Sequence, residues 1–456
     1  MGIYNLISNI VNLFSLHNFD KSINWILRRM RKFIITALML FAISQMNEAK
    51  AREQKINKPE REVSNANYQE NKITYKFGGY VELKAYTDDY KSKTTRNQMI
   101  YLYPLAPEYN MGRDINKYST LNASVFASRL NFSVTGMEFM NAKVNTFIEA
   151  DFNGSSQATI YMLNIRHAYI NMAWGNSSLL MGQTDHLTLV NEVTASTLAF
   201  IAGYPFNPLN RSIQLRYTYN VAPNIKFLAA AHLYSAHKSV GPEDAQANAK
   251  IPDLQFQIKL GDPQKTFGGI TAGYKFLKPI VYDYQHNTNT PTMGTFNIGA
   301  FLRTNVEDKI LFKTWASYGK NMTMLGQLGG YLMEWNEHSS VKYESIGAIS
   351  WWQDTEVSLK GNFKAGFFAG YQTRLNATGK VRTGINPETL RDQKLLWFGK
   401  ISPRLTYNVS NKFILGVEYS RTTARWAQEI NGRLEPLSKH PKTANNRIEL
   451  MAKVIF

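Results

Sequence analysis

Polar and apolar side chains alternate along many short segments of this chain, and this spacing is the feature most able to support chemistry. In residues 129–134 (RLNFSV), 213–218 (IQLRYT) and 254–259 (LQFQIK), every second residue is apolar. A period of two places alternate side chains on opposite faces of a β-strand. Each such strand therefore has one apolar face and one polar face. The charges on the polar face are mostly basic, and basic groups gathered on one surface attract anions.

The same alternation, extended along the chain, predicts which charged residues share the polar face. Fifteen are basic: Lys84, Arg129, Lys143, Arg166, Arg216, Lys226, Lys259, Arg303, Lys313, Lys364, Arg374, Lys400, Arg404, Lys412 and Lys453. Five are acidic: Glu82, Glu149, Asp151, Glu418 and Glu449. This face is therefore predicted to be electropositive, although His167 falls opposite Arg166 in parity. The alternative is that the basic charges balance lipopolysaccharide phosphates at a membrane rim, or carboxylates in loops.

The sequence gives little support for catalysis or for metal binding. The chain has no Gly-x-Ser-x-Gly, His-Glu-x-x-His or Gly-x-x-x-x-Gly-Lys-Ser/Thr motif. It has no cysteine, which excludes disulfides, thiolate zinc sites and cysteine nucleophiles. Asp185-His186 or His232 could belong to a phospholipase-like Ser-His-Asn site, but eight scattered His are more typical of rim residues. Asp185-His186 and Glu337-His338 are too sparse for a metal site. We predict no enzyme activity, no metal, no cofactor and no nucleic-acid partner.

Sixteen segments of alternating character carry these residues. They lie at about 75–89, 128–136, 143–152, 160–173, 178–184, 211–220, 224–235, 252–260, 266–276, 295–304, 308–319, 344–352, 358–374, 395–408, 411–424 and 446–456. The hydrophobic share of 44% and the aromatic share of 13% argue against a disordered chain or a coiled coil. The longest apolar run, 33–43, is shorter than the roughly 20 residues that a membrane-spanning helix needs.

The connections between these segments alternate in length. Seven short turns are predicted at 138–142, 174–177, 221–223, 261–265, 305–307, 353–356 and 409–410. Eight connections fall between them, at 90–127, 153–159, 185–210, 236–251, 277–294, 320–343, 375–394 and 425–445, and all but the second are long. The sequence therefore predicts an all-β fold: a transmembrane up-and-down antiparallel β-barrel of 16 strands, with both termini on the side of the short turns.

The two ends of the chain carry export and assembly signals. A basic cluster at 28–32 precedes the apolar run, and Ala49-Lys50-Ala51 offers a cleavage site, so residues 1–51 are predicted to be a targeting region with a cleaved signal peptide and a true start at Met30. Removing that region lowers the net charge from +18 to +14. Residues 52–74 are predicted to be a flexible periplasmic lead before a barrel at 75–456. The final strand ends in Phe456, a pattern typical of bacterial outer-membrane barrels.

The connection 185–210 is more apolar than an exposed loop should be. We predict that it folds into the barrel and narrows a channel, with its apolar side chains buried against the wall. The alternative is packing at a subunit interface. The candidate constriction residues are Asp185, His186, Glu192, Phe200, Tyr204 and Phe206.

Several strings in fixed order resemble a known family. They are FGGY at 77–80, SRL at 128–130, FIEADF at 147–152, IRHAYI at 165–170 and LMGQ at 180–183. This series resembles the DcaP-like outer-membrane porins and, more distantly, the phosphate-selective porins. The resemblance implies a sixteen-stranded trimeric barrel that passes small anionic solutes, with Arg129, Glu149, Asp151 and Arg166 on the pore wall. The periplasmic coiled coil that such porins can carry is not matched, because residues 52–72 show no heptads.

These patterns together predict an outer-membrane porin. Small hydrophilic solutes, preferably anionic, would diffuse passively through a basic lumen. The predicted partners are those solutes, outer-membrane lipid, lipopolysaccharide and two further copies in a homotrimer. The alternative is a barrel that acts mainly as an adhesin or ligand-binding surface protein through its long loops.

Overall fold

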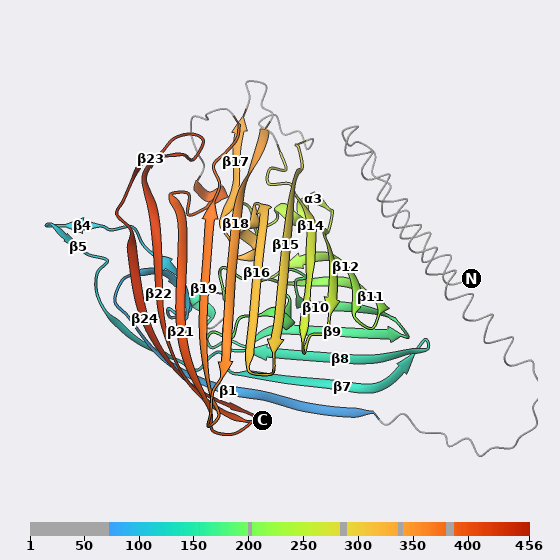
Figure 1. Ribbon diagram of the computed structural model, residues 1–456. Helices are drawn as coiled ribbons and strands as arrows, with labels where there is room; N and C mark the ends of the chain where they lie inside the picture. The colour runs from blue at the N-terminus through green and yellow to red at the C-terminus, as the bar shows by residue number, and fades with distance from the viewer. Residues whose placement is uncertain (1–72, 155, 199–202, 283–289, 336–340, 380–386) are drawn as a thin grey trace, which may run out of the picture. The chain divides into compact units, whose positions relative to one another are not determined.

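A computed structural model describes residues 73–154, 156–198, 203–282, 290–335, 341–379 and 387–456, in which sixteen strands close into an antiparallel barrel (Figure 1). No helix in this part of the chain is long and apolar enough to cross a membrane. The barrel strands are β1 (Thr74–Asp88), β7 (Arg129–Phe139), β8 (Ala142–Asp151), β9 (Asn164–Trp174), β10 (Ser177–Asp185), β11 (Arg211–Ala222), β12 (Ile225–Ser235), β13 (Asp253–Gly261), β14 (Thr266–Leu277), β15 (Met293–Val306), β16 (Ile310–Lys320), β18 (Val341–Ser358), β19 (Phe363–Arg374), β21 (Leu395–Asn408), β22 (Phe413–Ile430) and β24 (Thr443–Ile455).

The barrel closes where the last strand meets the first. Strand β24 pairs with β1 from Tyr80↔Ile455 to Asp88↔Arg447. The other edge of β1 pairs with β7 and, further along, with the short β6 (Thr120–Ser124), so β6 and β7 together act as one interrupted strand. Closure leaves no edge strand with unpaired backbone groups, as a strand-built membrane protein requires. The predicted all-β fold and its sixteen antiparallel strands are confirmed.

Alternation separates the two faces of the wall. Phe367 is 42% exposed on the outside, whereas its neighbour Phe368 is fully buried on the inside. Leu130 and Phe132 are likewise exposed on the outer face, at 39% and 41%. A continuous outer band of large apolar side chains is stable only when hydrocarbon surrounds it.

One predicted turn is wrong. Strand β18 continues through 353–356 to Ser358, and the chain reverses at 359–362 instead. Asp354 and Glu356 caused the error, because two carboxylates close together resemble turn residues. They lie on alternate positions of a strand, and the Asp354 side chain is fully buried inside the barrel.

The connections between the barrel strands contain small elements of their own. These are β2 (Ser92–Thr95), β3 (Ile100–Pro104), β4 (Tyr109–Asn110), β5 (Arg113–Asp114), β17 (Gly329–Trp335), β20 (Leu390–Arg391), β23 (Pro436–Lys439), the helix α3 (Ala245–Ala249) and the 3-10 turns η1 (Gln157–Thr159), η2 (Asn191–Val193), η3 (Met322–Leu325) and η4 (Pro387–Thr389). The β2–β3 hairpin departs from the expected polar outer loop, since every residue of β3 is buried. The Tyr103 ring packs at a tilt against Phe398 and edge-on against Trp426, and Trp426 Nε1 donates to Pro104 O at 2.9 Å.

The predicted signal peptide at 1–51 and almost all of the predicted lead at 52–74 lie outside the described residues, as does Phe200. Predictions about these residues therefore stay predictions.

Removing Phe456 should impair barrel assembly. Its backbone exchanges two hydrogen bonds with Gly79, of 3.1 and 3.2 Å, and its ring stacks on Phe77 with centroids 6.1 Å apart, so it completes the seam between β24 and β1. We expect the truncated chain to reach lower membrane levels as heat-modifiable protein, measured by electrophoresis of boiled and unboiled membranes. The matched control is Phe363→Ala, which removes an aromatic ring that stacks on Tyr407 away from the seam. Normal levels of the truncated chain would contradict an assembly role for Phe456.

Candidate functional site

A β-bulge in β9 brings two adjacent side chains to the inner face of the barrel. Glu149 pairs with His167 and Ala150 pairs with Ile165, so Arg166 is an extra residue with no partner of its own in the ladder. Bulges of this kind redirect side chains. Arg166 and His167 consequently both turn away from lipid, while Ile165 stays on the outer face at 54% exposed. The bulge explains how Arg166 and His167, which are neighbours in the sequence, can both face the interior although strict alternation would place them on opposite faces.

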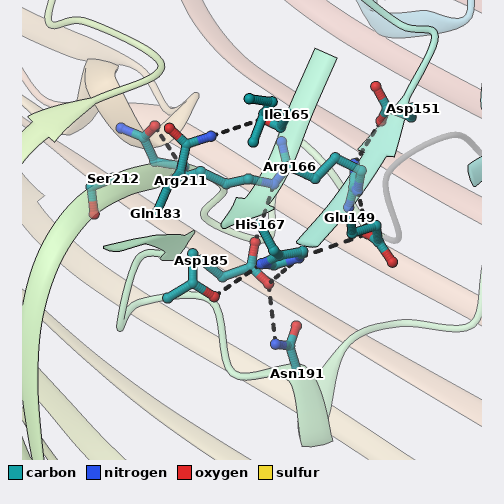
Figure 2. A network of polar contacts seen from close by, with 12 residues as sticks. Glu149, Asp151, Ile165, Arg166, His167, Gln183, Asp185, Asn191, Arg211 and Ser212 are labelled. Atoms are coloured by element: carbon teal, nitrogen blue, oxygen red, sulfur yellow. Dashed lines mark hydrogen bonds and ion pairs between the residues drawn. The ribbon is translucent and has the colours of Figure 1, made fainter. Parts of the chain in front are cut away.

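Arg166 lies at the centre of a network of alternating charges (Figure 2). Its Nε donates to Glu149 Oε1 at 2.6 Å, and its Nη1 donates to Asp151 Oδ2 at 2.8 Å. Glu149 also accepts from Arg129 Nη1 at 3.3 Å. The charges of these four side chains nearly cancel. The network is therefore a rigid, balanced part of the wall rather than a free basic surface.

The network continues through His167 to the end of β10. His167 Nε2 lies 3.8 Å from Glu149 and 3.9 Å from Asp185. In Figure 2 the His167 ring lies between these two carboxylates. Asp185 also pairs with Arg211 Nε at 3.4 Å and accepts from Asn191 Nδ2 at 3.1 Å. Asp185 thus ties the wall to the first turn of the connection that follows it.

A second network lies between β1 and β24. Lys84 Nζ is 3.3 Å from Glu82 and 3.4 Å from Glu449. Arg447 forms a two-pronged pair with Asp88, with distances of 2.8 and 2.9 Å.

A third network links β16, β18, β19 and β21. Arg404 binds both oxygens of Asp354, at 2.6 and 3.1 Å. Lys313 lies 3.8 Å from the same carboxylate, and Lys364 lies 3.4 Å from Glu356.

These networks correct the predicted excess of unpaired basic charge. Five carboxylates were not assigned to the interior by parity: Asp88, Asp185, Glu192, Asp354 and Glu356. Nine of the fifteen predicted cations have an acidic partner among the described residues, and four of the nine pair with one of these five carboxylates. Among the described residues, six of the fifteen predicted cations make no ion pair: Lys143, Arg216, Lys226, Arg303, Arg374 and Lys412. Arg374 instead donates to the carbonyl oxygens of Leu375 and Leu434.

The other predicted basic residues occupy varied places. Lys143 and Lys226 are exposed near the short-turn end of their strands. Lys400 is buried 3.9 Å from Glu418, and Lys453 lies 3.4 Å from Glu82. Lys412 belongs to the turn between β21 and β22 rather than to a strand, because β22 begins one residue later.

The described residues of the segment 186–210 pack against the inner wall in the apolar core that also contains Tyr103. The Phe206 ring is fully buried, with centroids 6.0 Å from Phe368 and 5.0 Å from Phe398. Its carbonyl accepts from Ser350 Oγ at 2.8 Å. A Cβ on Gly370 would lie 2.7 Å from the Phe206 ring, so a glycine is needed to admit that ring to the wall.

The remaining described constriction candidates are also anchored. His186 is buried, 3.3 Å from Asp253 and stacked on His232 with centroids 3.9 Å apart. Glu192 accepts from Lys259 Nζ at 2.7 and 2.9 Å. Burial opposes ionisation of Glu192, but the adjacent ammonium group holds the pKa of this carboxyl below its usual value. Tyr204 packs against the apolar core.

Sequence reasoning missed the aromatic part of the inner wall. Trp315, Trp352 and Phe368 occupy inward positions, which parity had treated as polar. The signal was present: these strands carry large apolar residues on both faces, beside inward glycines such as Gly370. That pattern is typical of a wall buried on both sides.

A closed barrel with an apolar outer band, charged networks inside and a segment folded against its inner wall is the architecture of an outer-membrane channel. No family model and no curated protein sequence matches the chain. Solved structures do match.

The outer-membrane channel DcaP of Acinetobacter baumannii superposes with a TM-score of 0.63 at 18% sequence identity, covering 84% of this chain and 97% of that one. The anion-selective porin from Comamonas acidovorans superposes with a TM-score of 0.52 at 8% identity, covering 84% of this chain and all of that one. The resemblance to DcaP-like porins is confirmed at the level of the fold. The chain therefore shares the closed antiparallel barrel fold of these two outer-membrane proteins.

Replacing Arg166 with Gln should destabilise the barrel strongly. The change leaves Glu149 and Asp151 without their main counter-charge, and breaking a buried ion pair from one side costs roughly 3 kcal/mol or more. Denaturant unfolding of the refolded protein in lipid or detergent would measure the loss. Arg129→Gln is the matched control: the Arg129 side chain is 25% exposed, so we expect a loss below about 1 kcal/mol. Equal losses in both variants would contradict a central role for Arg166.

Proposed function

We propose that the chain is a porin that lets small hydrophilic solutes diffuse passively across the outer membrane and prefers anions. The anion-selective porin among the structural neighbours agrees with this proposal. The main observation in support of the proposal is the distribution of charge on the inner face of strands β12 to β16.

Four inward cations lie side by side on strands β12 to β16. Lys226 stands directly opposite Lys259, and Arg303 stands directly opposite Lys313. The described strands β12 to β16 contain one carboxylate, Asp253, which lies at the other end of β13 against His186. Like charges that face each other across strands are destabilising. This part of the wall therefore has an excess of positive charge that the strands themselves do not balance.

Glu192 of the inward segment neutralises Lys259, and Asp354 lies 3.8 Å from Lys313. No acidic partner offsets the charge of Arg303: it makes no ion pair with any described residue, and its Nε is buried without a hydrogen-bond partner among them. Arg216 is its counterpart on β11, where it donates to Gln214 Oε1 at 3.0 Å and to a carbonyl of Asp185. A positive wall in a narrow aqueous passage raises the local concentration of anions.

Arg303→Gln should reduce anion preference without closing the channel. Removing one uncompensated charge weakens the field that attracts anions, while changes inside a barrel tune selectivity more than stability. The measurement is the reversal potential of single channels in planar bilayers under a KCl gradient, which should move toward zero.

The matched control is Lys309→Gln, the same charge change in a short turn where the side chain is 74% exposed. Its reversal potential should equal that of the wild type. A reversal potential unchanged by Arg303→Gln would contradict the assignment of Arg303 to the conducting path.

A porin in the outer membrane is expected to have further partners. We propose a homotrimer, and contacts of the outer rim with lipid and lipopolysaccharide. Cross-linking in native membranes should give a species of three chains, and a monomer as the largest species would contradict the trimer. The second candidate function, an adhesin or ligand-binding surface protein, would gain support if the folded barrel conducts no ions.

A further inference from the structure

Two residues of the inward segment, Ser196 and Leu198, are each held by one acidic and one basic side chain of the wall. Residues 196–198 are called the tip below. Ser196 N donates to Asp354 Oδ2 at 2.8 Å, and Ser196 Oγ accepts from Lys313 Nζ at 2.7 Å. Leu198 N donates to Glu418 Oε2 at 2.7 Å, and Leu198 O accepts from Lys84 Nζ. The four wall residues belong to β18, β16, β22 and β1. The tip is thus fixed from several strands of the barrel.

The four wall side chains are withdrawn from solvent. Their exposed fractions are 0% for Asp354, 1% for Glu418, 3% for Lys84 and 8% for Lys313. The two carboxylates have cations behind them, because Arg404 binds Asp354 at 2.6 Å and Lys400 lies 3.9 Å from Glu418. Hydrogen bonds to charged groups are stronger than neutral ones, and more so in a poorly hydrated setting.

The wall also leaves space at Gly416 for the Leu198 side chain, and this space is called the seat below. The Leu198 side chain is buried, and a Cβ on Gly416 would lie 2.8 Å from Leu198 Cδ1. Gly416 lies two residues before Glu418 on the same strand and face. One strand therefore supplies both the space for the side chain and the acceptor for the backbone N–H of the same residue.

We propose that Lys84, Lys313, Asp354 and Glu418 are positioning residues: they set the width of the passage by fixing residues 196–198, and they do not attract solutes. The inference rests on the proposed function, since a width matters only if the barrel conducts. It reassigns two of the predicted lining cations, Lys84 and Lys313. It also separates two kinds of charge in one lumen: charges that hold the segment and charges, such as Arg303, that act on the solute.

The test uses Glu418→Gln in the full-length chain. Loss of the charged acceptor weakens the hold on Leu198 N, so the segment samples positions away from the wall. We expect noisier single-channel currents and an open-channel conductance changed by roughly two-fold, because mean passage width follows the position of the segment. Lys364→Gln is the control, since Lys364 is a lumen cation paired with Glu356 that makes no described contact with the segment.

A reversible lock makes the test specific. The chain contains no cysteine, so Leu198→Cys with Gly416→Cys introduces a single pair at the seat. In the Glu418→Gln background the oxidised pair should restore wild-type conductance and noise, and a reducing agent should abolish that restoration. In the wild-type background oxidation should change neither quantity. Heat-modifiable migration of every variant establishes that the barrel has folded.

Two outcomes would overturn the proposal. One is a Glu418→Gln channel with wild-type conductance and noise. The other is an altered reversal potential that the oxidised pair does not reverse, since that would show Glu418 acting on the solute by its charge. A wild-type channel without anion preference would contradict the proposed function instead, while leaving the conductance and lock measurements able to judge the positioning role.

Discussion

Pairing of charges inside a wall that is surrounded by hydrocarbon is the constraint on which the rest of the structure depends. The outer face of each strand must be apolar where hydrocarbon surrounds it, so most charged side chains of the barrel strands are directed inward. There they lose part of their hydration, and an uncompensated buried charge is costly. The interior meets this requirement with networks such as Arg166 with Glu149 and Asp151. Arg303 differs from these residues, because it makes no ion pair with any described residue.

The inner wall is divided between polar and apolar regions. Strands from β14 to β22 carry inward aromatic residues, among them Trp315, Trp352 and Phe368, and these form a core with Phe206 of the inward segment. The β2–β3 hairpin adds Tyr103 to the same core. The barrel is consequently buried on both sides along this arc. The described residues of the inward segment are held by packing of the same kind that holds a globular domain together.

Strand positions were predictable because a period of two is a local property that each segment displays by itself. The pairing of charges was not, since Arg404 meets Asp354 across fifty residues of sequence and only the closed barrel brings them together. The bulge at Arg166 was equally hidden: one extra residue changes the face of its neighbour without altering composition. The turn expected at 353–356 failed for a related reason. Local sequence cannot distinguish a solvated carboxylate from one whose partner lies on another strand.

For the candidate site, too, local patterns were predictable from the sequence and contacts between distant strands were not. Parity identified Arg129, Arg166 and Arg303 as inward residues, and the apolar content of 185–210 indicated that this segment packs against something. The seat that receives the segment could not be inferred, because Gly370 and Gly416 are informative only when the side chains opposite them are known. Apolar residues on both faces of β18 and β19 were the nearest available signal.

The most direct measurement of the central claim is the reversal potential of the wild-type protein in planar bilayers under a KCl gradient, repeated at increasing ionic strength. An excess of inward positive charge predicts a potential of the sign that chloride permeation gives. Because salt screens exposed charges over about 10 Å at 0.1 M and over less at higher concentration, that preference should decline as salt rises. A cation-selective channel would contradict the account.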